Sequence, residues 1–244
     1  MKKLTVYSHT ERPDLREQTW DSRTNWPEFI FHAEGPKEIT AQLLEKFPQF
    51  QLYYCESEDQ LAAYSIAIPI PWTGHDEDLP EGWTPALELG LREGIQDPTT
   101  LCALGVDIRP DRQGQGYSRE ILLAMKHTAD CHGFSFLIAP VRPTFKDRYP
   151  LTAIDDYIAW KREDGQPFDP WIRVHWKIGG RIARAAPKSM SVRGTVDDWE
   201  KWTDMSFPTS GEYVVPGALA LVSIDRENNC GYHEEPNVWI IHDV

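Results

Sequence analysis

The residues that could do chemistry in this 244-residue chain gather between positions 99 and 180. A loop with two glycines, residues 113–118, follows an apolar run and precedes a segment with helical periodicity. The first N–H groups of a helix carry a partial positive charge, and glycine lets an anion approach the backbone closely. The loop therefore predicts a binding turn for a phosphate group.

The spacing within this loop separates the known kinds of phosphate-binding turn. No G-x-x-x-x-G-K-[ST] string occurs anywhere in the chain, which excludes a Walker A loop. A dinucleotide fingerprint would need a third glycine at position 119, where this chain has Arg119. What remains is the hexapeptide Gln113-Gly114-Gln115-Gly116-Tyr117-Ser118.

The elements on either side must position this loop. Residues 99–108 form a nearly continuous apolar run, which predicts a strand buried on both faces. After the loop, one helical face collects Tyr117, Ile121, Leu122, Met125 and Ala129, and Gly133 ends that helix. Residues 134–140 then predict a second buried strand.

The rest of the chain mixes strands and helices without strict alternation. Strands are predicted at 4–7, 51–55, 61–70 and 238–241, and a hairpin or long strand at 211–224. Helices are predicted within 12–32, with an interruption near Pro27, and at 36–47 and 85–93. This order favours an α+β fold with a mixed sheet, and no linker divides residues 1–244 into separate domains.

The hexapeptide resembles the acyl-CoA pyrophosphate loop of the GNAT acyltransferase superfamily, usually given as Q/R-x-x-G-x-G/A. Gln113 and Gly116 match the first and fourth positions, and Ser118 stands where the pattern has Gly or Ala. The resemblance covers residues 99–180. It implies a mostly antiparallel, mixed sheet flanked by helices, with fourth and fifth strands that splay apart.

The resemblance also implies a CoA site. In GNAT folds the pantetheine arm lies between the splayed strands and binds backbone groups of the fourth strand, here Leu104, Gly105 and Val106. Gly105 is also a candidate for a β-bulge without any role in ligand binding. The pyrophosphate would bind at the loop, and the residues implied there are Arg112, Gln113, Gly114, Gln115, Gly116, Tyr117 and Ser118.

A histidine occupies a position where GNAT enzymes usually have a tyrosine. Residues 174–180 fit the family pattern L-Y-x-K-x-G-F, with His175 at the position of the tyrosine that protonates the departing CoA thiolate. Asp169 and Pro170 supply an N-cap and a first-turn proline for the helix that carries it. A histidine can donate a proton near neutral pH, so His175 is the candidate acid. The alternative is a structural histidine in a helix–sheet contact.

Residues 141–168 form an insertion between the fifth strand and this helix, and a short helix is predicted at 151–160. Thr144 in this insertion is either a hydrogen-bond donor in the site or a turn residue after Pro143. A His/Thr pair on a GNAT core looks like the GNAT-like loading domains of polyketide synthases. Those domains decarboxylate malonyl-CoA and transfer acyl groups to the thiol of a carrier protein.

The charge of the chain limits the classes of molecule that it is expected to bind. The net charge of −13 argues against nucleic acid, whose phosphates an acidic protein repels. Residues 141–193 nevertheless carry +5, so the remainder carries −18. This cationic stretch indicates either a place for an anionic ligand or partner, or a solvated surface.

Other features place the chain among soluble proteins without a metal site. The four cysteines form no C-x-x-C pair, Cys55 and Cys102 lie in apolar runs typical of buried thiols, and the eight histidines show no metal-ligand spacing. No apolar run is long enough for a membrane helix, and the N-terminus lacks the apolar stretch of a signal peptide. A cytoplasmic location without a metal is therefore expected.

The sequence thus predicts an acyltransferase that moves an acetyl or other short acyl group directly from CoA to an amine. Two alternatives stay open. One is a GNAT-like malonyl-CoA decarboxylase and S-acyltransferase acting on an acyl carrier protein, and the other is a CoA-binding module without catalysis. The acceptor, the acyl chain length, the general base and the oligomeric state are not determined by the sequence.

Overall fold

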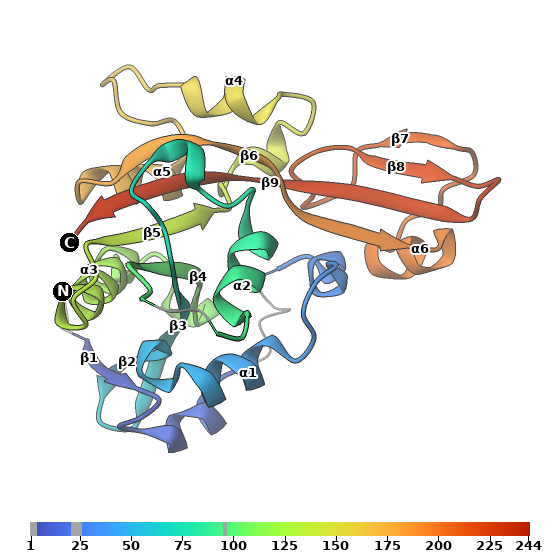
Figure 1. Cartoon of the computed structure of the whole chain (residues 1–244). Helices are drawn as coiled ribbons and strands as arrows, with labels where there is room; N and C mark the ends of the chain where they lie inside the picture. Colours follow the sequence, from blue (N-terminus) through green and yellow to red (C-terminus); the bar gives the residue numbers. More distant parts are fainter. Residues whose placement is uncertain (1–3, 21–25, 95–96) are drawn as a thin grey trace.

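The structure is a computed structural model that describes residues 4–20, 26–94 and 97–244 (Figure 1). In this part of the chain, nine strands form one sheet in the order β1-β2-β3-β4-β5-β9-β8-β7, with β6 on the other edge of β9. Only β4 and β5 pair in parallel, and the other pairs are antiparallel. The strands are β1 Thr5–Ser8, β2 Leu52–Ser57, β3 Gln60–Ile70, β4 Thr100–Ile108, β5 Phe136–Val141, β6 Arg181–Gly194, β7 Gly211–Tyr213, β8 Val222–Asp225 and β9 Cys230–Asp243.

Helices cover both faces of this sheet. They are α1 Ile39–Lys46, α2 Trp83–Leu91, α3 Tyr117–Cys131, α4 Ile154–Ala159, α5 Pro170–Lys177 and α6 Val196–Thr203. Side chains of α3, α4 and α5 join Leu101 and Leu137 in one core cluster, whereas α1 and α2 pack with Cys102 and Ile138 in another. Successive residues of a strand point to opposite faces, so α3 and α5 lie on one face and α1 and α2 on the other. Within the described ranges, every helix is too short or too polar to span a bilayer.

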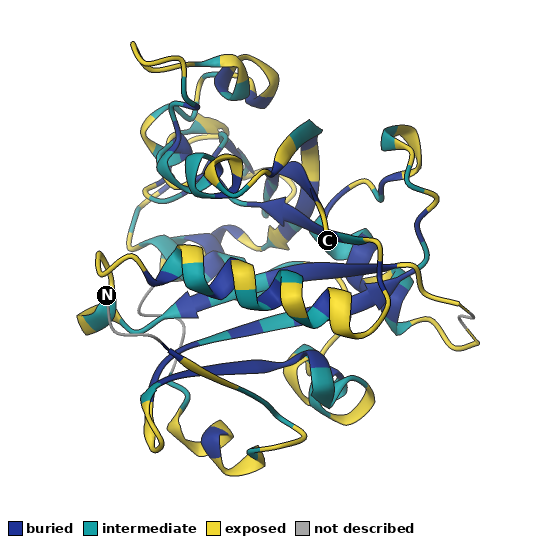
Figure 2. Ribbon diagram, turned by 90° about the vertical axis from the view of Figure 1, so that its left-hand side faces the viewer, coloured by how far each residue is buried: buried dark blue, intermediate teal, exposed yellow. Residues whose placement is uncertain are grey.

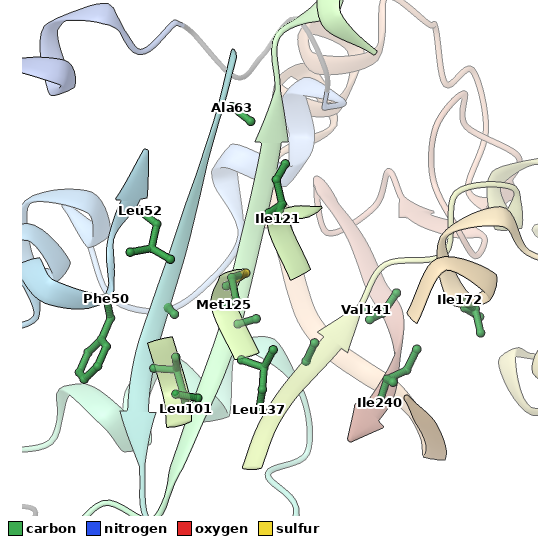
Figure 3. Packing of buried hydrophobic residues seen from close by; sticks show 14 of the residues in the cluster. Phe50, Leu52, Ala63, Leu101, Ile121, Met125, Leu137, Val141, Ile172 and Ile240 are labelled. Carbon is green, nitrogen blue, oxygen red and sulfur yellow. The ribbon is translucent and has the colours of Figure 1, made fainter. Parts of the chain in front are cut away.

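The central unit confirms the sequence prediction. The apolar run becomes β4, the loop leads into α3, and β5 follows. The five residues predicted for the inner face of α3 are all buried, and Gly133 ends the helix with a φ of 76°. Figure 3 shows Ile121 and Met125 of α3 packed above β4 and β5. Cys55 and Cys102 are buried, as expected for structural thiols.

Several helices differ in type or length from the sequence predictions. Residues 12–32 form two short 3₁₀ helices, Pro13–Gln18 and Glu28–His32, rather than α-helices, and residues 21–25 of this stretch lie outside the described part. Each short helix buries a single side chain, Leu15 or Phe29, so neither has the apolar face that packs a longer α-helix against a core. Helix α1 begins at Ile39 instead of Pro36, because Glu38 adopts a left-handed conformation with a φ of 51°.

Further corrections concern the second half of the chain. Helix α2 begins at Trp83, before the predicted residue 85, and α4 is shorter than the predicted 151–160. For the segment 211–224 the hairpin alternative is confirmed and the long strand is wrong: β7 and β8 pair antiparallel, and the chain turns between them at Gly217 with a φ of 80°. Strand β9 is much longer than the predicted 238–241.

Strands β6 and β9 extend as an arm beyond the central sheet, seen on the right of Figure 1 with β7, β8 and α6. The sequence analysis did not predict β6 or α6. Strand β6 carries charged residues and a proline, Pro187, which lies where its register with β9 shifts. A proline is tolerated at such an irregularity because it donates no ladder hydrogen bond.

The strands are mostly buried, and the outer faces of the helices are exposed (Figure 2).

Candidate active site

Strands β4 and β5 pair over three residues and then part. The parallel ladder joins Thr100, Leu101 and Cys102 to residues 136–138, whereas β4 continues to Ile108 and β5 to Val141. In Figure 3 the two strands diverge above Leu101 and Leu137. Beyond Cys102, no described strand pairs with the edge of β4 that faces β5. The prediction of splayed central strands is confirmed, and the edge of β4 that β5 leaves uncovered can take up an extended ligand.

A bulge in β4 lies where the strands part. On the side of β3, Ile66 pairs with Gly105 and Ala67 with Ala103, which makes Leu104 the extra residue. The predicted bulge is therefore present, with Leu104 rather than Gly105 unpaired. Bulges redirect backbone groups and are frequent beside active sites.

Trp83 of α2 lies over this bulge and was not singled out in the sequence. Its indole Nε1–H donates to the carbonyl oxygen of Leu104 at 2.6 Å, and its backbone N–H donates to Oγ of Ser189 on β6 at 2.7 Å. Helix α2 thus contacts β4 and β6 at the level where β4 and β5 separate. Only tertiary packing brings this tryptophan there, because positions 83 and 104 share no sequence pattern.

The glycine loop leads into α3 without a side-chain cap. A 3₁₀ turn, Pro110–Arg112, precedes it, and Gly114 and Gly116 have φ values of 75° and 84°. Gly116 is the N-cap of α3, and among the described residues no side-chain cap bonds the start of this 15-residue helix. A side chain at Gly114 would meet no atom within 4 Å. The loop therefore offers the N–H donors of a helix start without a side-chain cap, an open approach at Gly114 and the positive end of the helix dipole, which suits a pyrophosphate.

The side chains of the loop mostly stabilise the loop itself. Nε of Arg112 lies 3.0 Å from Oε1 of Glu56 at the end of β2, and its Nη1 lies 3.0 Å from Oδ2 of Asp111. The hydroxyl of Tyr117 donates to the same Glu56 oxygen at 2.6 Å, and this hydrogen bond raises the pKa of Tyr117 to about 12. The amide of Gln113 donates to the carbonyl oxygen of Ile108 at 3.4 Å.

Three of the implied side chains, those of Arg112, Gln113 and Tyr117, are thus already engaged, while Gln115 is exposed and Ser118 half-buried. Arg112 is partly neutralised by two carboxylates, so the backbone is the feature of this loop that best suits a phosphate.

His175 is buried against the sheet. It lies near the end of α5, its Nδ1 is 2.9 Å from Nε2 of His242 on β9, and the Trp171 ring packs edge-on against it at 4.5 Å. Its Nε2 is buried and has no hydrogen-bond partner among the described residues. Burial, together with His242, holds the pKa of His175 well below its usual value, so the imidazole is neutral.

Thr144 is exposed and follows the end of β5 by three residues. Asp169, the predicted N-cap of α5, connects this segment to the helix that bears His175. Its Oδ1 accepts from the N–H groups of Trp171 and Ile172 at 2.9 and 3.2 Å. Its Oδ2 accepts from the N–H of Phe145 and the hydroxyl of Tyr157, both at 2.8 Å. One buried carboxylate therefore holds α5, α4 and the Thr144 loop in a single arrangement.

Replacement of Asp169 by alanine is expected to lower the free energy of unfolding by about 2–4 kcal/mol, because it removes an N-cap and leaves buried donors without an acceptor. The matched control is Asp164→Ala, which removes an exposed carboxylate that accepts from Gln166 and pairs with Arg162. This control variant is expected to lower the free energy of unfolding by less than about 1 kcal/mol. Urea unfolding measures the free energy of unfolding of the two variants. An equal decrease in both would contradict the assigned role of Asp169.

Most cations of the stretch 141–193 have partners within the fold. Arg142 pairs with the buried Glu235, and Lys146 donates to the carbonyl oxygens of Tyr149 and Leu219 at 2.8 and 2.6 Å. Further partners are Asp76 for Arg181, Leu79 and Pro80 carbonyls for Arg184, Glu234 for Lys188 and Glu34 for Arg193. Several of these cations thus join distant segments of the chain, while Arg181, Lys188 and Arg193 stay mostly exposed.

No metal centre accompanies the site in the residues that the structure describes: they contain no group of three or more His, Cys, Asp or Glu side chains placed to hold a metal ion.

Comparison with known proteins establishes the fold and the family. No protein-family model matches the chain. It is 30% identical, over 96% of its length and 91% of the relative's, to the arginine N-acetyltransferase avaD of Aspergillus versicolor. Among solved structures, it superposes on the loading GNAT-like domain of CurA from Lyngbya majuscula with a TM-score of 0.64, at 20% identity over 98% of this chain and 97% of that one.

A second solved structure agrees in fold. The GNAT-like decarboxylase GphF, in complex with isobutyryl-CoA, superposes with a TM-score of 0.59, at 15% identity over 98% of both chains. These structural likenesses show the fold, and the curated relative shows the family. The chain belongs to the GNAT N-acetyltransferase family, and it is an acyltransferase that transfers an acyl group from acyl-CoA to an amine.

Proposed function

We propose that this protein transfers an acetyl or other short acyl group from CoA to a small amine of the arginine class, by direct attack in a ternary complex. The observation that carries the proposal is the parting of β4 and β5 beside the uncapped start of α3. The similarity to an arginine N-acetyltransferase over nearly the whole chain supports the choice of acceptor.

All of the predicted residues except Arg112, which Glu56 and Asp111 engage, have a role in this proposal. The backbone N–H groups of residues 113–118 bind the pyrophosphate, and the edge of β4 that β5 leaves uncovered around Leu104, Gly105 and Val106 binds the pantetheine amides, although the carbonyl of Leu104 already accepts from Trp83. His175 protonates the departing thiolate. Thr144 donates a hydrogen bond at the acyl end, an assignment supported by its connection to α5 through Asp169.

An acceptor assay tests the proposal. Purified protein is incubated with acetyl-CoA and arginine, lysine, ornithine or agmatine, and the products are identified by mass spectrometry. Formation of acetylarginine, with release of one CoA thiol per product, is the expected result. The same protein with malonyl-CoA tests the alternative: release of acetyl-CoA and carbon dioxide, without any acylated amine, would favour the decarboxylase over the N-acetyltransferase.

Replacement of Gly116 by valine is expected to weaken CoA binding by about tenfold or more, equivalent to ~1.4 kcal/mol. A β-branched residue is strained at a φ of 84°, so the loop must change the direction of its N–H groups. Isothermal titration with CoA measures the dissociation constant.

The control is Gly133→Val, which carries the same strain at a φ of 76° beyond the opposite end of α3. Gly133 has open space around it, so a side chain at this position adds backbone strain without a clash. If CoA binding is weakened equally in the two variants, CoA binds away from the loop.

A further inference from the structure

Two buried imidazoles from distant parts of the chain form a hydrogen-bonded pair beneath α5. His175 is 1% exposed and His242 is fully buried, and their ring centroids are 5.1 Å apart. The hydrogen bond joins Nδ1 of His175 to Nε2 of His242 at 2.9 Å. The outer nitrogens, Nε2 of His175 and Nδ1 of His242, are buried and have no partner among the described residues. The proposed function uses His175 and leaves His242 without a role.

The fold makes room for this pair at Gly180. A Cβ at that position would lie 2.6 Å from Cε1 of His242 and 2.8 Å from the carbonyl oxygen of His175. The N–H of Gly180 also donates to that carbonyl at 2.9 Å. Gly180 lies directly before β6, so the end of α5 and the start of β6 are built around the His242 ring.

Both histidines are neutral in the resting protein. Burial lowers the pKa of His242 to about 4; the positive charge of Lys126 on α3 contributes in the same direction, and Asp243 on β9 opposes it. For His175, burial is the main cause of the lowered pKa and His242 the second. Two neutral imidazoles carry two ring hydrogens, and one of them lies in the shared bond. Only one outer nitrogen therefore carries a hydrogen.

The two possible tautomers give His175 opposite chemistry. If Nδ1 of His175 donates to His242, then Nε2 of His175 keeps a lone pair and can accept a proton. If Nε2 of His242 donates instead, Nε2 of His175 carries a hydrogen. A neutral imidazole is a far weaker acid than a CoA thiol, so this second tautomer cannot protonate the thiolate. An effective donor must first become an imidazolium.

We propose that His175 carries a proton from the acceptor nitrogen to the CoA sulfur, and that His242 is a positioning residue that accepts the Nδ1 hydrogen of His175. This inference rests on the proposed function and supplies its general base. After the amine attacks, Nε2 of His175 takes the proton from the positively charged nitrogen of the tetrahedral intermediate. The carbon–sulfur bond then breaks, and the same proton passes to sulfur.

The step is balanced, because one carbon–nitrogen bond forms, one carbon–sulfur bond breaks and one proton moves from nitrogen to sulfur. Nitrogen and sulfur are bonded to the same carbon of the intermediate, so a single imidazole nitrogen can reach both. The lone pair on Nε2 of His242 stabilises the transient imidazolium by accepting its Nδ1 hydrogen, as an orienting group does in other histidine-based sites.

Nitrogen-15 NMR of the whole protein with labelled histidine tests the tautomer without any substrate. Long-range ¹H–¹⁵N spectra at neutral pH distinguish ring nitrogens that carry hydrogen from those with a lone pair. Spectra of His175→Gln and His242→Gln assign the two rings. The expected result is a hydrogen on Nδ1 of His175 and a lone pair on its Nε2. A hydrogen on Nε2 of His175 would overturn the proposal.

Kinetics tests the positioning role. His242→Leu removes the acceptor of the hydrogen bond, and kcat should fall by about 100-fold because the tautomer is no longer held. His242→Gln keeps a side-chain oxygen as acceptor and should retain kcat within about threefold of the wild type. The dissociation constant for CoA should stay unchanged in both variants.

Two kinetic outcomes would refute the assignment of His242. One is that the leucine and glutamine variants lose activity equally, and the other is that neither loses it. If the wild type acetylates no amine at all, the proposed function fails, while the NMR result still decides the tautomer.

Discussion

His175→Ala is expected to lower kcat for acetyl transfer by about 10²- to 10⁴-fold, the range of general acid–base contributions. The variant lacks the only titratable group that the proposed mechanism uses to move a proton at the thioester. Because His175 lies on α5 and the pyrophosphate loop precedes α3, the dissociation constant for CoA should change little. Steady-state kinetics at saturating acetyl-CoA, together with titration of CoA, separates the two effects.

The control for this experiment is His127→Ala, which removes an exposed imidazole on α3. Its kcat should equal that of the wild type. A His175→Ala variant that loses CoA affinity and kcat to the same extent would show a structural histidine instead of a catalytic one. Circular dichroism and the free energy of unfolding establish whether the fold survives the cavity left by the ring.

Glu235→Ala is expected to lower the free energy of unfolding by about 3–5 kcal/mol, the usual cost of breaking a buried ion pair from one side. Glu235 is fully buried on β9, pairs with Arg142 and accepts from Nε2 of His233 at 2.7 Å. Burial raises the pKa of Glu235, but Arg142 and His233 more than offset this effect, so its pKa is lowered overall. The alanine variant would leave the charge of Arg142 buried without a counter-ion.

The neighbouring Glu234 provides the matched control. It pairs with the mostly exposed Lys188 at 2.9 Å on β6, and an exposed pair of this kind contributes about 0–1 kcal/mol. Urea unfolding of Glu234→Ala and Glu235→Ala compares adjacent carboxylates on one strand. Similar losses in the two variants would mean that the Arg142 pair does not stabilise the junction between β5 and the arm.

Local signals in the sequence were sufficient for the central unit. The apolar run of β4, the glycines of the loop and the helical periodicity of α3 are each encoded within a few residues, and the structure confirms all three. Asp169 and Pro170 likewise predict the start of α5, because an N-cap depends on the chain immediately beside it. These elements are the ones that position the candidate CoA site.

Elements stabilised mainly by distant partners were missed or misjudged. Strand β6 has no strong apolar alternation, and it exists because it pairs with β9 along nearly its whole length. The segments 13–18 and 28–32 contain helix-compatible residues, but each buries one side chain in a short turn. Strand propensity depends on cross-strand neighbours, which a local window does not contain.

The sequence by itself determined the glycine loop that is the candidate phosphate-binding turn, its flanking strand and helix, and the register that makes His175 a candidate for catalysis. Only the tertiary structure decided what surrounds that histidine. His242 is 67 residues away and Glu235 is 93 residues from Arg142, so no local pattern pairs them. Burial and a specific partner, rather than residue type, set the protonation state of an imidazole, and both arise only when α5 packs on β9.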